Sequence, residues 1–390
     1  MGDVAEFGRA VLVVSAGLSL AVAGRVLAGR LGVPSAALLL VVAAAASDLS
    51  SRLADLLTIT EVQRLTTVAL VVILFDGGMS MGLRRFRVAA APIVLLGLVG
   101  TFATAGLVAL AAHGLLGLSW TVSGLIGAAI APTDPAVTFS VLAGREVHGG
   151  SATILEGESG FNDPAGIALM VGLVELATHP DGSFVTVVWD FLREMGIGLA
   201  VGVVGGLILS RLLARLVLPE ESLYPVAVLL SAGVVYGAAA VAHGSGFLAV
   251  FVAGIAVGDI AYPQRDGVLH FHSTLASLGE LAVFIALGLT VDLGSIASEG
   301  LWWRGLALAA LLGFVIRPTV VGGLLAPFGL TTRGRVFVMW SGLKGAVPIL
   351  LASLTVAGRT AYAPQIYGIV FVVVLFSVVV QGSLVSRFAD

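Results

Sequence analysis

The sequence predicts an all-α polytopic membrane protein with about thirteen transmembrane helices, and three observations support this fold class. Hydrophobic residues make up 58% of the 390 residues and another 51 are glycine, whereas apolar residues including glycine are about half of a typical soluble domain. Charged residues make up only 11%, against about a quarter in soluble proteins. With short loops, a helix of about 20 apolar residues needs roughly 30 residues of chain, so about thirteen helices fit.

Apolar segments follow one another along the chain and are separated by charged or turn-forming residues. The thirteen segments cover approximately residues 11–27, 34–46, 65–81, 88–112, 120–142, 153–177, 197–218, 224–242, 247–262, 273–291, 306–327, 336–356 and 366–385. The second and ninth segments are short. Since no connecting loop is long enough for a soluble regulatory domain, residues 1–390 are expected to form a single transmembrane domain.

The first segment is interpreted as an uncleaved transmembrane helix. Asp3 and Glu6 precede it with only Arg9 as a positive charge, which is the wrong balance for the start of a signal peptide. With the N-terminus outside, twelve arginines fall on the inner side and six on the outer side. The positive-inside rule therefore predicts a multi-pass protein of the plasma (inner) membrane, with a cytoplasmic C-terminus.

Charge and cysteine content exclude several other classes of protein. The formal net charge of -3 leaves no basic face for nucleic acid, so no nucleic-acid partner is expected. Because the chain has no cysteine, disulfides, iron–sulfur clusters and thiol chemistry are excluded.

Two of the segments carry a charged residue beside helix-breaking residues. The fifth contains Ala-Pro-Thr-Asp-Pro at 131–135, and the twelfth contains Leu-Lys-Gly-Ala-Val-Pro at 343–348. Each proline removes a backbone hydrogen bond and clashes with the preceding turn, so both helices are expected to open near their middles. In lipid, such openings are tolerated only around a polar cavity.

The positions of the two breaks predict an inverted repeat. Each broken segment is the fifth member of a six-helix set when the seventh segment, within a linker helix of about 184–218, is set aside. Repeat one covers about 7–178 and repeat two about 222–387, with opposite orientations in the membrane. Transporters built this way place their site where the two discontinuous helices cross.

The sixth segment carries a polar cluster within an otherwise apolar helix. Its carboxylates are Glu156, Glu158 and Asp163, and each costs about 2.5 to 3.5 kcal/mol to insert, so they are not expected to face lipid. Ser159 and Asp163 share one helix face, and Glu158 and Asn162 share the neighbouring face. Hydroxyl and carboxylate oxygens on one face suit an alkali cation or a proton.

Two candidate site residues are of types that occur only once in the chain. Asn162, in the sixth segment, is the only asparagine, and Lys344, in the twelfth segment, is the only lysine. Arg317, in the eleventh segment, is always charged and needs a fixed partner, for which Glu158 is the first choice. Lys344 could offset the negative ends of the half-helices. The remaining embedded acids are interpreted as structural pairs or helix-end groups: Asp76, Glu175, Asp259 and Glu280.

At these residues the chain resembles the NhaP-type monovalent cation/proton antiporters, which include the animal sodium/proton exchangers. The specific similarities are Thr133-Asp134, Glu158-Ser159 followed by Asn162-Asp163, Arg317-Pro318, and the run from Gly342 to Pro348. The run from Glu158 to Pro164 is most similar to the potassium/proton branch, related to cell volume regulation protein A. That resemblance implies exchange of K⁺ or Na⁺ for protons, with no cofactor and no catalytic residues.

The resemblance also implies roles for individual residues. The cation would be held by Asp163, Asp134, Ser159 and the Thr133 carbonyl, with Asn162 supporting the site. The remaining implied roles are a structural ion pair between Glu158 and Arg317 and half-helix charge compensation by Lys344, which stands where the family usually has arginine. An asparagine–aspartate pair marks the electroneutral branch, so exchange is expected to be electroneutral, by rocking of a core bundle against a dimerisation bundle in a homodimer.

Members of the potassium branch often continue into cytoplasmic regulatory domains, so a separate regulatory subunit is a possible partner of this chain. The sequence leaves three alternative classes of protein. A sodium-coupled symporter on a related inverted-repeat scaffold would need an organic-substrate pocket, and an ion channel would favour rings of identical groups. An intramembrane serine protease would use Gly-Glu-Ser-Gly at 157–160 with His243 as base. A metal site at His270 and His272 has no third ligand, so no metal other than an alkali cation is expected.

Overall fold

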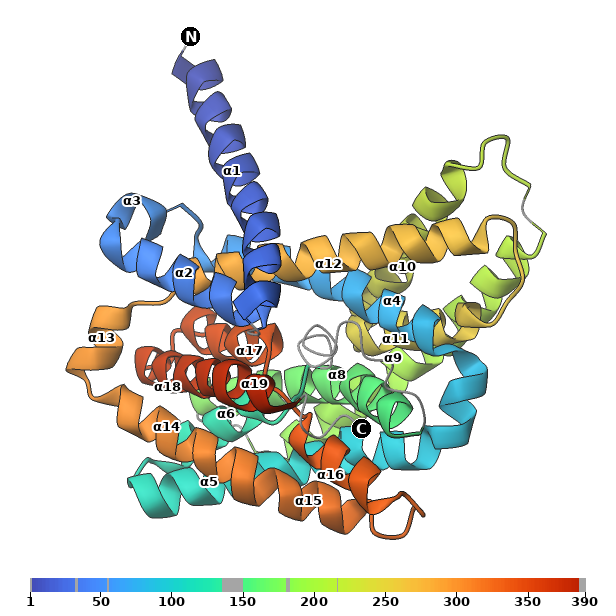
Figure 1. The fold of residues 1–390 in the computed structure, drawn as a ribbon. Helices are drawn as coiled ribbons and strands as arrows, with labels where there is room; N and C mark the ends of the chain where they lie inside the picture. Colours follow the sequence, from blue (N-terminus) through green and yellow to red (C-terminus); the bar gives the residue numbers. More distant parts are fainter. Residues whose placement is uncertain are drawn as a thin grey trace.

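The computed structural model describes residues 2–31, 34–54, 56–134, 150–179, 183–215 and 217–385. Regular secondary structure within these ranges is entirely helical, and they contain no strand (Figure 1). The predicted all-α class is therefore confirmed for the described part of the chain. The second half of the predicted fifth segment, with Pro135, lies outside the described residues.

The N-terminal half contains long helices and one π-helical turn. Its helices are α1 Gly2–Leu31, α2 Ser35–Leu49, α3 Ser51–Ala54, α4 Ile59–Val94, α5 Thr101–Leu116, α6 Trp120–Ile130 and α8 Gly150–Thr178. The π-helical turn Leu95–Gly100 joins α4 to α5. The third and fourth predicted segments are separated by a kink at Gly82, where the backbone is not helical.

The C-terminal half has shorter helices, two of which are continued by π-helical turns. Its helices are α9 Phe184–Leu213, α10 Leu223–Val241, α11 Gly246–Gly258, α12 Arg265–Leu289, α13 Leu293–Ser298, α14 Leu301–Leu311, α15 Arg317–Leu324, α16 Thr332–Trp340, α17 Ala346–Ala357, α18 Ala363–Phe376 and α19 Gly382–Val385. The π-helical turn Leu312–Ile316 joins α14 to α15, and Ser377–Gln381 joins α18 to α19.

Length and composition identify the helices that can cross a membrane. Within the described ranges, six helical stretches are long and apolar enough to do so: Ile59–Leu116, Phe184–Leu213, Leu223–Val241, Arg265–Leu289, Leu301–Leu324 and Ala363–Val385. Four shorter apolar helices are α2, α6, α11 and α17. The chain is thus a multi-pass membrane protein, while the count of thirteen helices and the inverted repeat stay predictions.

The direction of α4 changes at Gly82, which has a φ of 65°. Asp259, directly after α11, accepts a hydrogen bond from the backbone N–H of Arg84 at 2.6 Å. A Cβ atom at Gly82 would lie 2.6 Å from the Asp259 carboxylate, so both the φ angle and the contact require glycine. Asp259 therefore serves as a helix-end group for the turn that follows the kink.

The second helix break is present but differs from the expectation, whereas at the first only the end of α6 and the residues up to 134 belong to the described part of the chain. Residues 131–134 follow α6 without helical structure, and residues 341–345 separate α16 from α17. The sequence analysis attributed the second break partly to Pro348, but Pro348 lies in the first turn of α17, where its missing N–H has no intrahelical partner to lose. The glycines at 342 and 345 lie in the break itself.

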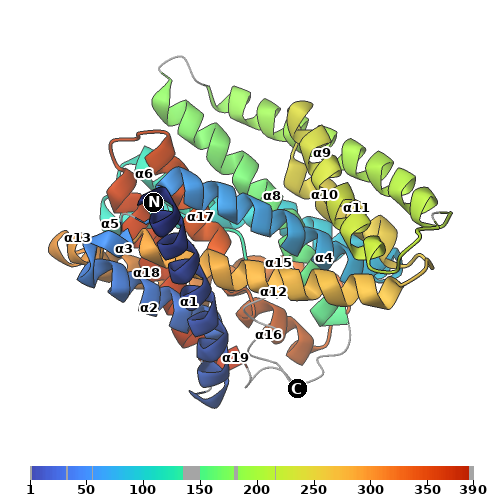
Figure 2. The same cartoon turned by 90° about the horizontal axis from the view of Figure 1, so that it is seen from above.

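Helix α8 contacts helices of two groups, α4 and α11 in one and α6 and α17 in the other. We call α1, α2, residues 59–81 of α4, α10, α11 and α12 the flanking bundle. We call α5, α6, α8 and α14 to α19 the site bundle. In Figure 1, α2 and α12 run along the upper side and α14 and α15 along the lower side, and Figure 2 shows α4 and α12 running side by side. The polar residues of α8 are thus enclosed by both bundles.

Candidate functional site

The polar cluster of α8 is buried in the interior of the molecule. Glu158, Ser159, Asn162 and Asp163 have relative exposures of only 1% to 4%. Burying a polar group without a hydrogen-bond partner costs about 2 to 7 kcal/mol. The partners of each side chain therefore indicate whether it supports the fold or is held ready for a ligand.

The two non-helical segments are in direct contact beside α8. The backbone N–H of Asp134 donates to the Leu343 carbonyl at 2.8 Å. A Cβ atom at Gly345 would lie 1.8 Å from the Asp134 carboxylate, so only glycine leaves room for that side chain. The breaks that the sequence predicts in separate helices are thus joined by a backbone hydrogen bond.

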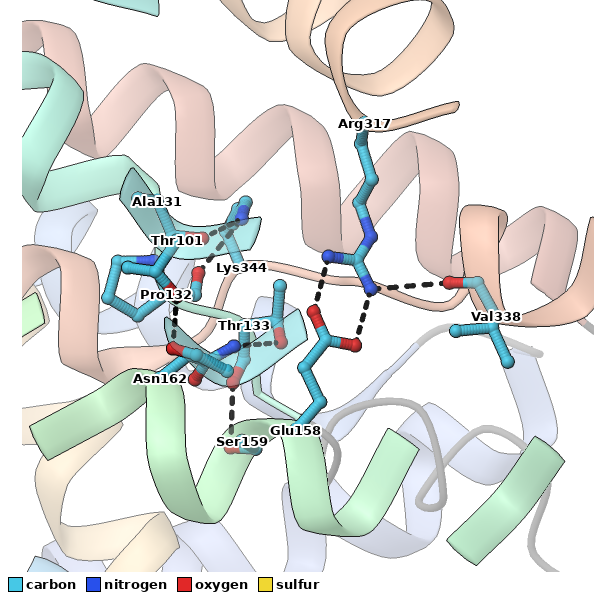
Figure 3. Close-up of polar contacts among 11 residues, drawn as sticks. Thr101, Ala131, Pro132, Thr133, Glu158, Ser159, Asn162, Arg317, Val338 and Lys344 are labelled. Atoms are coloured by element: carbon cyan, nitrogen blue, oxygen red, sulfur yellow. Dashed lines mark hydrogen bonds and ion pairs between the residues drawn. The ribbon is translucent and has the colours of Figure 1, made fainter. Parts of the chain in front are cut away.

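Thr133 connects the first break to α8 through both its backbone and its side chain. The Ser159 hydroxyl donates to the Thr133 carbonyl at 2.8 Å, and the Asn162 amide donates to the Thr133 hydroxyl at 2.8 Å (Figure 3). These two bonds fix the segment after α6 against one face of α8. The only asparagine of the chain therefore has a positioning contact in the site.

Asp163 has little hydrogen bonding for a buried carboxylate. Its Oδ2 atom lies 3.4 Å from the Ser159 hydroxyl, whose shorter bond goes to Thr133. Among the described residues, Asp163 Oδ1 and Asn162 Oδ1 have no hydrogen-bond partner. Since buried polar atoms are nearly always paired, these oxygens have capacity for a bound proton or ion.

Lys344 lies in the second break and reaches the end of the other broken helix. Its ammonium group donates to the carbonyls of Ala131 and Pro132, each at 2.9 Å (Figure 3), while its backbone N–H donates to the Ser377 hydroxyl at 2.9 Å. The carbonyls at a helix C-terminus carry partial negative charge and have no helical partners. Lys344 satisfies two of them beside Thr133.

Glu158 makes a bidentate ion pair with Arg317. The two N–O distances are 2.8 and 3.0 Å, and Arg317 also donates to the Val338 carbonyl at 3.2 Å (Figure 3). A Cβ atom at Gly342 would lie 1.7 Å from the guanidinium group. Arg317 therefore fills space that the glycine leaves, and it links α8, α15 and α16 through charge-assisted bonds.

A cavity of about 400 Å³ leads from the molecular surface to this cluster. Its deep wall includes Asp134, Ser159 and Asp163, whereas Ser80 and Ser273 at its other end are exposed. Hard cations prefer oxygen ligands such as carboxylates, carbonyls and hydroxyls. The cavity therefore gives a hydrated ion a route to a buried oxygen cluster, whereas Glu158 and Arg317 do not line it.

Asp76 and Glu280 also line this cavity, which differs from their interpretation as structural pairs or helix-end groups. Asp76 Oδ1 is buried without a hydrogen-bond partner in the described structure. Ser273, Ser277 and Glu280 follow a spacing of four and three residues on α12, so they share one helix face. That polar stripe is the sequence signal that identifies the cavity wall, together with Asp76 and Ser80 on α4.

The side chains weighed for other chemistry have different surroundings. The Ser159 hydroxyl is bonded to Thr133 and not to a histidine, and His243 is exposed in the turn between α10 and α11. His272 is buried and bonded to the Val268 carbonyl at 2.9 Å, whereas His270 is exposed. Within the described ranges, no three His, Cys, Asp or Glu side chains are grouped as metal ligands.

Comparison with known proteins gives a family match over nearly the whole chain. The model of the family described as "Sodium/hydrogen exchanger, transmembrane" matches residues 17–390. In fold, the chain is similar to the sodium proton antiporter MjNhaP1 of Methanocaldococcus jannaschii at pH 8, with a TM-score of 0.82 and 21% identity over 98% of both chains.

Curated relatives include proteins named for two different cations. The K⁺/H⁺ antiporter NhaP of Alkalimonas amylolytica is 36% identical over 83% of this chain and 56% of its own length. The K⁺/H⁺ antiporter NhaP2 of Shewanella sp. (strain ANA-3) is 33% identical with the same coverages. The Na⁺/H⁺ antiporter NhaH of Halobacillus dabanensis is 28% identical over 84% of this chain and 83% of its own length. The chain thus spans little more than half of the two K⁺/H⁺ relatives.

Proposed function

Because this chain belongs to the NhaP-type sodium/hydrogen exchanger family, we propose that it is a secondary active antiporter that exchanges a monovalent cation, K⁺ or Na⁺, for protons. The observation that carries the proposal is Asp163, a buried carboxylate with an unpaired oxygen at the deep end of a cavity. The relatives of higher identity are named for K⁺, so K⁺ is the first cation to test.

In the proposed mechanism, proton and cation compete for one oxygen cluster. Asp163 and Asp134 supply carboxylates, Ser159 supplies its hydroxyl, and Thr133 supplies its carbonyl. A proton on Asp163 removes the charge that attracts the cation, so the site carries one or the other. Rocking of the two bundles then exposes the loaded site to each side of the membrane in turn, as in other inverted-repeat transporters.

Neighbouring residues keep this cluster in place without binding the transported ion. Asn162 holds Thr133, and Lys344 offsets the negative end of α6. Glu158 and Arg317 neutralise each other and tie the site bundle together. Because Asn162 is an amide where a second acid would release another proton, one proton is exchanged per monovalent cation.

The proposed membrane arrangement is the one that the sequence predicts. We propose thirteen transmembrane helices with inverted repeats at about 7–178 and 222–387, joined by the linker helix. The N-terminus lies outside and the C-terminus in the cytoplasm of a homodimer in the plasma membrane, which places the mouth of the cavity at the cytoplasmic face. We also propose a role in pH homeostasis and regulation through a separate subunit.

Electroneutral exchange is tested in proteoliposomes with an imposed pH gradient and K⁺, Na⁺ or Rb⁺. Initial rates are compared at zero potential and at a large diffusion potential that does not depend on the tested cation. We expect equal rates, because a two-proton stoichiometry would couple transport to voltage by about 2.3 kcal/mol per 100 mV. A current on a solid-supported membrane that tracks turnover contradicts the one-for-one stoichiometry. Absence of exchange with every alkali cation contradicts antiport itself.

A further inference from the structure

A second cavity lies beyond the carboxylate cluster, near the other end of the helices that line the first cavity. It has a volume of about 460 Å³. Its wall includes the polar residues Asp292, Ser295 and Glu299, of which Asp292 and Glu299 are exposed. Thr290 and Tyr367 also line it. None of the residues in this wall lines the first cavity.

The two cavities lie at different heights along the same helices, as the positions of their lining residues on α12 and α17 show. On α12, Phe284 lines the first cavity and Thr290 the second, which is about 9 Å of helix. On α17, Val347 lines the first cavity and Val356 the second, about 14 Å along the axis. The cavities therefore approach each other from opposite ends of the same helices.

Helix α4 also passes both cavities, but along this helix the second cavity comes before the first. Ile59 lines the second cavity, and Leu70 is the first residue of α4 in the wall of the first cavity. Between them, the Gln63 side-chain amide donates to the Ser353 hydroxyl on α17 at 3.0 Å. Ser353 is fully buried, so this hydrogen bond lies inside the barrier between the two cavities.

A second contact between hydroxyl groups crosses the barrier between the end of α12 and α18. The hydroxyls of Thr290, which directly follows α12, and Tyr367 on α18 are 2.5 Å apart, and Tyr367 is buried. In both contacts one partner belongs to the flanking bundle and the other to the site bundle. A relative movement of the bundles that opens the second cavity must therefore break both hydrogen bonds.

We propose that the contacts Gln63–Ser353 and Thr290–Tyr367 form a latch that closes one half of the ion path, and that the second cavity is the vestibule of that half. The inference rests on the proposed antiport function. In the conformation described here the latch is closed, and the first cavity reaches Asp163 from the other side. Opening of the latch, with closure of the first cavity, completes alternating access.

The chain has no cysteine. Pairs of introduced cysteines can therefore test the latch without interference from native thiols. Oxidation of the double variant Gln63→Cys with Ser353→Cys should abolish exchange, and a reductant should restore it. The matched control is Ala69→Cys with Gly279→Cys, since a Cβ atom at Gly279 on α12 would lie 3.2 Å from the Ala69 Cβ on α4 and both residues belong to the flanking bundle. Disulfide formation is verified by thiol counting with mass spectrometry. Parent-like exchange by the oxidised latch pair overturns the proposal.

A second measurement does not depend on transport. Leu350 is 5% exposed and lies between Val347 and Ser353 on one face of α17. In oriented vesicles, an impermeant maleimide added on the second-cavity side should label Leu350→Cys slowly. Adding Gln63→Ala and Tyr367→Phe should raise the labelling rate several-fold. Unchanged labelling overturns the latch, whereas a parent chain without exchange but with the expected labelling overturns only the antiport function.

Discussion

Glu158 and Asp163 are buried carboxylates on the same helix, five residues apart, yet their surroundings are opposite. Both oxygens of Glu158 are paired with Arg317 at 2.8 and 3.0 Å. Asp163 has one long contact to Ser159 and one oxygen without a partner in the described structure. The first carboxylate has no place for a ligand, whereas the second lies in a cavity wall.

This difference separates a carboxylate that stabilises the fold from one that is available for chemistry. The ion pair joins three helices of the site bundle, so its charges are neutralised by the protein itself. Asp163 has no such partner in the described structure, which is why we propose that a proton or a cation neutralises its charge. Burial alone is thus a poor indicator of function, and the number of unused oxygen contacts is a better one.

The largest expected effect is on the exchange rate, which should depend on the charge of Asp163. Asp163→Asn removes the charge that proton and cation share, so exchange should fall to the level of empty proteoliposomes. The folded yield should stay near that of the parent chain, because no ion pair is broken. The matched control is Glu175→Gln, on the same helix but outside the cluster, which should keep the parent rate. Retained exchange in Asp163→Asn would falsify its role.

The second expected effect is on thermal stability, which should depend on Glu158 and not on Asp163. Glu158→Gln or Arg317→Ala leaves the remaining charge buried without its partner, which typically costs about 3 to 5 kcal/mol. Both variants should therefore show a lower melting temperature in detergent than the parent and than Asp163→Asn. Exchanging the two residues, Glu158→Arg with Arg317→Glu, should recover part of the loss. Melting temperatures equal to the parent in both single variants would show that the pair does not support the fold.

The third effect concerns the pH dependence of cation affinity. If a proton and a cation compete for Asp163, the apparent cation affinity weakens as pH falls, by up to about tenfold per unit, because the ligand must be deprotonated. The maximal rate at saturating cation should change less than the affinity. The measurement is the half-saturating K⁺ or Na⁺ concentration in proteoliposomes between pH 6 and 9. A constant value over that range would show that Asp163 is not protonated between pH 6 and 9, and hence that proton and cation do not exchange at this carboxylate under those conditions.

Sequence reasoning identified the residues of the cluster because they break strong local rules. Charges in apolar segments, a single asparagine and a single lysine stand out in a chain with 58% hydrophobic residues. The direct contact between Asp134 and Gly345 was not predictable, since it joins positions more than 200 residues apart. Its geometry depends on backbone bends whose directions no local pattern encodes.

Local sequence patterns do not predict the cavity walls or the contacts of the proposed latch, for a related reason. In the sequence, Glu280 and Asp76 suggest structural groups because each is a single acid without an adjacent polar run. Their role as cavity residues depends on α4 and α12 packing side by side, which places two weak polar stripes together. Likewise, Gln63 and Ser353 are 290 residues apart, and neither is unusual in its own segment.

The smallest expected effect extends the comparison to a carboxylate outside the membrane-spanning helices. Asp292 is exposed and caps α13, accepting hydrogen bonds from the side chain of Ser295 at 2.6 Å and from its backbone N–H at 2.8 Å. These bonds, led by the side-chain contact, hold the pKa of Asp292 below its usual range. Like Glu158, it is satisfied by the protein, but water screens its charge.

Because the folded-state pKa is lowered, the charged cap contributes stability above the usual aspartate pKa, and the contribution is lost as pH falls through the folded-state value. Asp292→Ala should therefore lower the melting temperature slightly at neutral pH, through a loss of at most about 1 kcal/mol for an exposed cap. The difference from the parent should shrink below about pH 4, where aspartate is normally protonated. Asp292→Asn, which can still cap the helix, should stay near the parent at neutral pH and show less pH dependence. The melting-temperature difference between Asp292→Ala and the parent could instead be the same at pH 7 and pH 3.5. That result would mean that the carboxylate charge has no part in the cap. This exposed carboxylate would then act only through its shape, unlike Glu158 in its buried ion pair.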